Sequence, residues 1–121
     1  MNEKTLKAIR GAVCSANNKA EIEQKTAGLY DKLLKANNLA ETDILSLIFS
    51  VTADIDAQNP AAALRRSGRA GELAMMVLQE ASVQDSLPGT IRVLIHAFIP
   101  GDKPVRHIYM EGAEKLRPDR A

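Results

Sequence analysis

Residues 91–99 have the sequence IRVLIHAFI, which is the clearest strand pattern in the chain. Apolar residues occupy every odd position from Ile91 to Ile99, and this alternation predicts a strand with one face buried in a core. The even positions carry Arg92, Leu94, His96 and Phe98. Burying a guanidinium group without an anion costs roughly several kcal/mol of free energy. Arg92 therefore requires a partner.

The sequence on either side of this strand predicts further strands and helices. Strands are expected over residues 6–13, 44–52, 73–80 and 105–111. An amphipathic helix is expected between the candidate caps Asn17 and Asn18 and the terminating pair Asn37-Asn38, and a short one over residues 60–67, after Asn59-Pro60. The tail is expected to form one helical turn before Pro118. The first strand, the first helix and the second strand form a crossover unit, and the whole order predicts a mixed sheet with flanking helices, α/β in the broad sense (mixed α+β).

Length and composition limit the size of the fold. The chain has 121 residues, of which 45% are apolar and 26% charged, values typical of one globular domain spanning residues 1–121. Aromatic residues contribute only 3% and Trp is absent, so we expect a modest aliphatic core that oligomerisation would help to stabilise.

Charge and residue usage exclude several classes of function. A net charge of +1 and a pI near 7.9 do not favour nucleic-acid binding. The longest apolar run, residues 73–78, is far below the roughly 18 residues that cross a membrane, and no signal segment begins the chain. Cys14 is the only cysteine, which fits a reducing cytoplasm and excludes an internal disulfide. His96 and His107 are too few for a zinc site, and no glycine-rich loop indicates a nucleotide cofactor.

Charged residues in apolar strands are the candidate functional groups. Arg10 shares its predicted strand face with small apolar residues, as Arg92 does with larger ones. Either Glu80 or Glu111 pairs with these arginines, or the arginines reach solvent, or they form with Tyr109 a pocket that binds a carboxylate-rich small molecule. The remaining arginine cluster, residues 65–69, is typical of a solvated helix face, although one of its members could face the same pocket.

Short motifs in a fixed order provide a more specific signal. In their order and spacing they resemble the small monofunctional bacterial chorismate mutases of the AroH type, over about residues 8–119. The motifs are Ile9-Arg10-Gly11-Ala12, Thr52-Ala53-Asp54-Ile55, Pro60-Ala61 with Arg65, Gln79-Glu80, Ile91-Arg92-Val93, Arg106-His107-Ile108-Tyr109 and Leu116-Arg117-Pro118-Asp119.

The resemblance implies a fold, an assembly and a reaction. The expected assembly is a cytoplasmic homotrimer, a pseudo-α/β-barrel with three active sites in clefts between neighbouring subunits. The expected reaction is the Claisen rearrangement of chorismate to prephenate in Phe and Tyr biosynthesis, without cofactor or metal. Positioning and electrostatics must then supply the whole rate enhancement.

The resemblance also implies a role for each matching residue. As catalytic groups, Arg92 donates to the breaking ether oxygen, while Glu80 accepts from the ring hydroxyl and orients Arg92. The substrate-binding residues are expected to be Arg10, Arg65, Met76, Val77, Tyr109 and Arg117.

The chain departs from the family pattern at three positions. Asn59, Ala62 and Val77 stand where an aromatic residue, a Lys and a Cys are common, which predicts weaker substrate affinity. Two alternatives stay open, a non-catalytic trimer that binds a small carboxylate and a trimeric relative of the imine deaminases. Glu80 beside Arg92 discriminates against both, because a carboxylate binder has no need of an acceptor for a hydroxyl.

Overall fold

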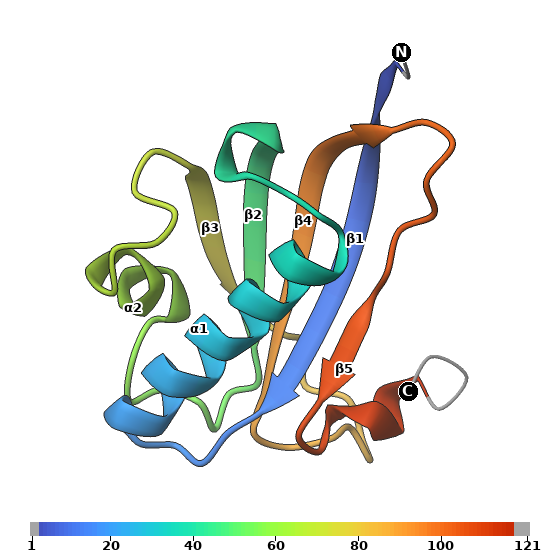
Figure 1. The fold of residues 1–121 in the computed structure, drawn as a ribbon. Helices are drawn as coiled ribbons and strands as arrows, with labels where there is room; N and C mark the ends of the chain where they lie inside the picture. The colour runs from blue at the N-terminus through green and yellow to red at the C-terminus, as the bar shows by residue number, and fades with distance from the viewer. Residues whose placement is uncertain (1–2, 118–121) are drawn as a thin grey trace.

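A computed structural model describes residues 3–117, so Pro118 and Asp119 of the last motif lie outside the described residues. The strands are β1 (Lys4–Cys14), β2 (Ile44–Val51), β3 (Ala74–Gln79), β4 (Thr90–Pro100) and β5 (Ile108–Met110). The helices are α1 (Lys19–Ala36) and α2 (Pro60–Arg66), with short 3₁₀ turns η1 (Glu41–Asp43) and η2 (Ala113–Leu116). The expected mixed α+β class is confirmed, and so is the helical turn near the end of the chain (Figure 1).

β4 is the centre of a sheet with the order β3-β2-β4-β1-β5. It runs antiparallel to both β1 and β2, while β3 is parallel to β2 and β5 is parallel to β1. β1 and β2 are therefore parallel to each other with β4 inserted between them. The predicted crossover unit is confirmed, and its two strands are separated by the strand whose pattern is clearest.

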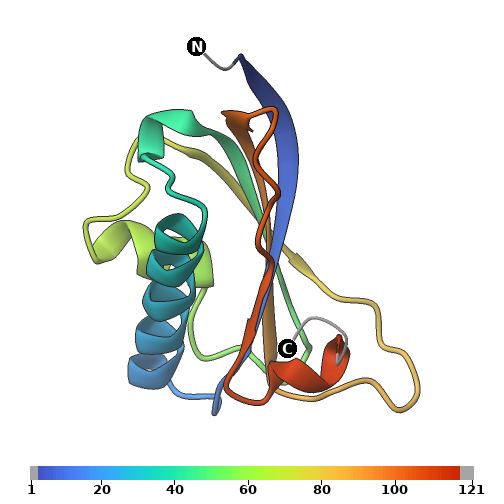
Figure 2. The ribbon, with the colours of Figure 1, turned by 45° about the vertical axis from the view of Figure 1, so that its right-hand side comes forward.

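Helices α1 and α2 lie on one face of the sheet (Figures 1 and 2). The Asn18 side chain accepts from the backbone N–H of Glu21 and caps α1, as expected, and α1 ends at Asn37. The core forms between α1 and the odd-numbered residues of β4, which are all nearly inaccessible to solvent. The aliphatic character of this core agrees with the low aromatic content of the sequence.

The short helix α2 begins and ends where the sequence predicts. Asn59 caps it by accepting from the N–H of Ala62 at 3.0 Å, and Pro60 occupies its first turn. The helix stops before Gly68, whose φ of +88° is a backbone conformation that favours glycine.

The opposite face of the sheet, which we call the outer face, is exposed to solvent in a single chain. Several large apolar side chains lie on it. They are Leu6, Met76, Leu78 and Phe98, with 48%, 58%, 51% and 40% of their surface exposed. Such a concentration of apolar surface is typical of an interface between proteins.

The strand expected over residues 105–111 is wrong at both ends, since β5 covers only Ile108–Met110. The side chain of Asn37 accepts from the N–H of Arg106 at 2.8 Å and donates to its carbonyl at 3.0 Å. The backbone of Arg106 is therefore bound to the end of α1 and does not pair with β1. At the other end, Glu111 has a φ of +48°, which turns the chain out of the strand.

Candidate active site

The register of the sheet brings three of the predicted site residues to the outer face. Arg92 on β4 is opposite Ala12 on β1, and Ala12 is in turn opposite Tyr109 on β5. Paired residues on neighbouring strands project to the same side of a sheet. Arg10 precedes Ala12 by two positions and shares that side. Three strands thus place Arg10, Arg92 and Tyr109 next to one another.

These residues line a pocket of about 540 Å³. The pocket also contains Ser50 from β2 and Leu116 and Arg117 from the end of the described chain. Its volume is in the usual range for a small-molecule site. Three guanidinium groups and a phenol around one cavity suit a small ligand with more than one carboxylate.

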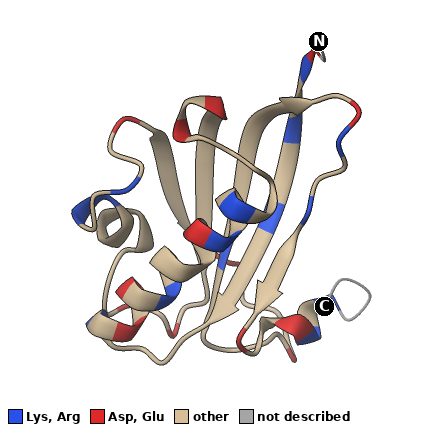
Figure 3. Ribbon diagram, viewed as in Figure 1, with Lys and Arg blue, Asp and Glu red and all other residues tan. Residues whose placement is uncertain are grey.

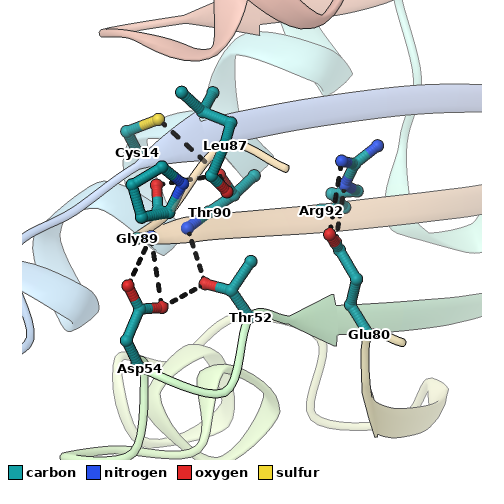
Figure 4. A network of polar contacts seen from close by, with 9 residues as sticks. Cys14, Thr52, Asp54, Glu80, Leu87, Gly89, Thr90 and Arg92 are labelled. Atoms are coloured by element: carbon teal, nitrogen blue, oxygen red, sulfur yellow. Dashed lines mark hydrogen bonds and ion pairs between the residues drawn. The ribbon is translucent and has the colours of Figure 1, made fainter. Parts of the chain in front are cut away.

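Arg92 forms an ion pair with Glu80, which follows β3 directly. The Nε–Oε1 distance is 2.8 Å, and a longer hydrogen bond joins Nη2 to Oε2 at 3.5 Å (Figure 4). The Glu80 side chain is 16% exposed and that of Arg92 is 40% exposed. Two of the interpretations of Arg92 are therefore compatible with the structure. Glu80 supplies the anion that pairs with Arg92, and the guanidinium of Arg92 still lines the pocket. Glu111 instead pairs with Lys25 at 2.9 Å.

Arg10 is an exposed residue, in agreement with the interpretation that these arginines reach solvent. The outer face is open, so its guanidinium meets solvent and the pocket. Its backbone N–H donates to Nδ1 of His107 at 2.9 Å. This bond joins β1 to the segment before β5 and gives a structural role to His107, to which the sequence assigned none.

Four of the predicted residues do not line this pocket, namely Arg65, Met76, Val77 and Glu80, although Glu80 pairs with the lining residue Arg92. Arg65 is exposed on α2, on the other side of the sheet. Met76 lies on the outer face beside Ile48, and Val77 is opposite the buried Phe49, so its side chain points toward the core. A single chain therefore brings together only part of the predicted set.

Ser50 is the polar residue of the pocket lining that the sequence analysis missed. It is opposite Arg92 in the sheet, and it lies on the outer face of a strand interpreted as mostly buried. The alternation of residues along β2 was the signal that could have placed it there.

Positive charge extends beyond the pocket. Figure 3 shows Lys and Arg on β1, on the second half of α1 and on the segment between β4 and β5. Residues 3–117 contain no group of three or more His, Cys, Asp or Glu residues that could hold a metal ion. No helix in the described range is long and apolar enough to cross a membrane.

Three comparisons relate the chain to known proteins. The family model described as chorismate mutase type I matches residues 6–120. The chorismate mutase AroH of Bacillus subtilis (strain 168) is 32% identical over 117 residues, covering 94% of this chain and 91% of that protein. The AroH chorismate mutase of Thermus thermophilus is 36% identical over 118 residues, covering 94% and 95%. The solved structure of a chorismate mutase from Clostridium thermocellum has a TM-score of 0.83 and 39% identity, covering 91% of this chain and 99% of that one.

Proposed function

The chain belongs to the type I chorismate mutase family, and from that premise we propose that the outer-face pocket is where it rearranges chorismate to prephenate. It is an isomerase of aromatic amino acid biosynthesis. The observation that carries the assignment to this pocket is the convergence of Arg10, Arg92 and Tyr109, with Glu80 held against Arg92.

The reaction depends on positioning and electrostatics more than on acid, base or nucleophilic groups of the protein. Chorismate is a dianion whose side chain must fold over its ring while one C–O bond breaks and one C–C bond forms. Neither a proton transfer nor a covalent intermediate is required of the protein. Donors fixed in advance where negative charge develops stabilise the transition state more than the ground state.

We assign Arg92 to the breaking ether oxygen. Its ion pair with Glu80 restrains the guanidinium before substrate arrives, so little reorganisation is needed during the reaction. Glu80 is also the acceptor for the ring hydroxyl. Arg10, Tyr109 and Arg117 surround the same cavity and bind the two carboxylates of the substrate.

The remaining predicted residues are assigned to a neighbouring subunit in a homotrimer. Arg65, Met76 and Val77 lie away from the pocket of their own chain, whereas the outer face exposes apolar side chains that a second copy would cover. A closed ring of three copies would repeat this contact at every interface, giving three sites between subunits.

Two further assignments accompany the proposal. We assign residues 1–121 to one domain, because the family model spans nearly all of them. We place the protein in the cytoplasm, which suits the free thiol of Cys14.

The departures at Asn59, Ala62 and Val77 affect affinity. Asn59 serves as the cap of α2, and Ala62 in its first turn brings no cation to the site. We expect a raised KM for chorismate with kcat retained, because Arg92 and Glu80 are both in place.

The experiment that tests the function is a continuous ultraviolet assay of chorismate loss, with prephenate identified by its acid conversion to phenylpyruvate. Arg92→Ala should lower kcat/KM by about a hundredfold to a thousandfold, the usual effect of removing one such donor. Arg92→Lys should be intermediate, since it keeps the charge and loses the planar fork. Arg69→Ala is the matched control and should leave turnover unchanged. Arg69 lies away from the pocket and forms an ion pair with Asp31, at a distance of 2.7 Å between the two side chains.

Two results would contradict the assignment. Activity of Arg92→Ala within tenfold of the unsubstituted protein would mean that another residue stabilises the ether oxygen. Thermal stabilisation by chorismate without any turnover would place the protein among non-catalytic carboxylate binders.

A further inference from the structure

The last residue of β2 and the segment that follows it hold the two ends of the loop between β3 and β4, residues 80–89. At the first end, the N–H of Glu80 donates to the carbonyl of Val51 at 2.8 Å. At the other end, both carboxylate oxygens of Asp54 accept from the N–H of Gly89, at 3.1 and 2.9 Å. Figure 4 shows this network beside the Arg92–Glu80 pair.

Asp54 is linked to β4 through a second hydrogen bond. The hydroxyl of Thr52 donates to Asp54, and its oxygen accepts from the buried N–H of Thr90 at 3.0 Å. The hydroxyl of Thr90 donates in turn to the carbonyl of Leu87 at 3.0 Å. A carboxylate suits this place because it is an acceptor only and has lone pairs for two donors at once.

The loop has few other means of fixing its position. Its middle residues 81–86 are exposed, and Val83 keeps 65% of its surface in solvent. Gly89 has a φ of +61°, and a Cβ there would lie 2.9 Å from the carbonyl oxygen of Ser15, so glycine is the residue that fits this close approach. The placement of the loop therefore depends on its two ends.

The two ends of the loop lie close to the groups that the reaction needs. Glu80 begins the loop, and Arg92 lies within β4, two residues after Thr90 on the same face of the strand. A displacement of the loop ends would therefore move Glu80 relative to Arg92, which it contacts at 2.8 Å. We propose that Asp54 is a positioning residue, which fixes Glu80 and Arg92 relative to each other without touching substrate. This inference rests on the proposed function.

The test compares Asp54→Ala, Asp54→Asn and Asp31→Ala in the chorismate assay. Asp54→Ala should lower kcat about tenfold to a hundredfold with KM changed less than threefold, because a misplacement of about 1 Å can cost on the order of a hundredfold in rate. Asp54→Asn should recover most of kcat, because its carbonyl oxygen can accept from Gly89 while its amide donates to Thr52. Asp31→Ala is the control, since Asp31 also accepts two hydrogen bonds, both from Arg69 at 2.7 Å, on the helical side of the sheet.

The outcomes separate this inference from the function on which it rests. If the unsubstituted protein does not turn over chorismate, the proposed function fails. If it does, the positioning role is wrong when Asp54→Ala retains kcat within twofold, or when its kcat/KM falls only because KM rises. The role is also wrong when Asp54→Ala and Asp31→Ala lower the melting temperature equally and lower kcat equally.

Should Asp54→Ala fail to fold, Thr52→Val carries the same test. This substitution removes the hydroxyl that joins Asp54 to Thr90 and leaves the carboxylate on Gly89 in place. A loss of kcat without a matching change in KM supports the proposal, and an unchanged kcat overturns it.

Discussion

At the level of single residues, the two tyrosines of the chain occupy opposite environments. Tyr30 on α1 is only 3% exposed, and its hydroxyl donates to Glu41. Burial, followed by this hydrogen bond and the charge of Glu41, raises the pKa of Tyr30 above its usual range. Glu41 also accepts from the N–H of Ala70, so the phenol belongs to a network that joins α1 to the turn before β3. Tyr109 is half-buried at the pocket.

The raised pKa of Tyr30 predicts that its tyrosinate absorbance appears in alkali only as the protein unfolds. Because the folded pKa of Tyr30 is raised, its contribution to stability is present below the unfolded value of about 10 and is lost as pH rises above it. The measurement uses Tyr109→Phe, which leaves Tyr30 as the one tyrosine of the chain. Ionisation of Tyr30 near pH 10 in the folded protein would contradict the role of burial.

Sequence patterns located Arg92 because a charge in an apolar strand is visible without any structure. They could not decide between an internal partner and a ligand, since both use the same guanidinium, and the structure shows the internal partner Glu80. Ser50 and Asp54 gave no comparable signal. A serine in a strand and an aspartate in a turn are ordinary, and their neighbours come from segments distant in sequence.

At the level of elements, alternation predicted the strands well wherever the backbone pairs along its whole length. β4 is the best case. β1 pairs with it along its whole length, and β2 pairs with it from Ile44 to Val51 with one register shift between Ile44 and Ser46. The prediction failed at both ends of residues 105–111, and at the first end the side chain of Asn37, the C-cap of α1, binds the backbone that a strand would use. Side-chain hydrogen bonds of this kind compete with the backbone hydrogen bonds of a sheet. They depend on tertiary contacts, which the local sequence pattern does not reveal.

The packing of α1 on β1 predicts opposite effects for one substitution at two glycines. A Cβ at Gly11 would lie 2.6 Å from Cδ1 of the buried Leu33, whereas one at Gly28 would meet nothing within 4 Å. Gly11→Ala should destabilise the fold by about 1–3 kcal/mol through overpacking. Gly28→Ala, exposed within α1, should stabilise it by about 0.5–1 kcal/mol.

Urea unfolding of both variants at equal protein concentration measures the difference. The concentration must match because association would add to the apparent stability. If Gly11→Ala were as stable as Gly28→Ala, the close contact between α1 and β1 would be wrong.

At the level of the whole molecule, the sheet has two unlike faces. One is covered by α1 and α2 (Figure 2), and the other carries both the pocket and exposed apolar side chains. The composition of the chain indicated that association would help a small aliphatic core. Composition could not indicate which face of the sheet associates, because it counts residue types without assigning them to a face. The resemblance to known enzymes supplied only the expectation of active sites between neighbouring subunits.

Sites shared between subunits predict that two inactive variants complement each other. In the proposed trimer, Arg92 comes from one subunit of each site and Arg65 from its neighbour. Arg92→Ala and Arg65→Ala homotrimers should each lose most activity at low chorismate concentration. When they are mixed, unfolded and refolded together in equal amounts, a site keeps both arginines in about a quarter of cases if subunits assemble at random.

The measurement is kcat/KM of the refolded mixture against each variant refolded alone. Recovery toward a quarter of the unsubstituted value requires that the two arginines act in one site and derive from different chains. A mixture no more active than the average of its components would mean that each subunit builds its site alone. Arg65, on the helical side of its own sheet, would then have no part in the reaction.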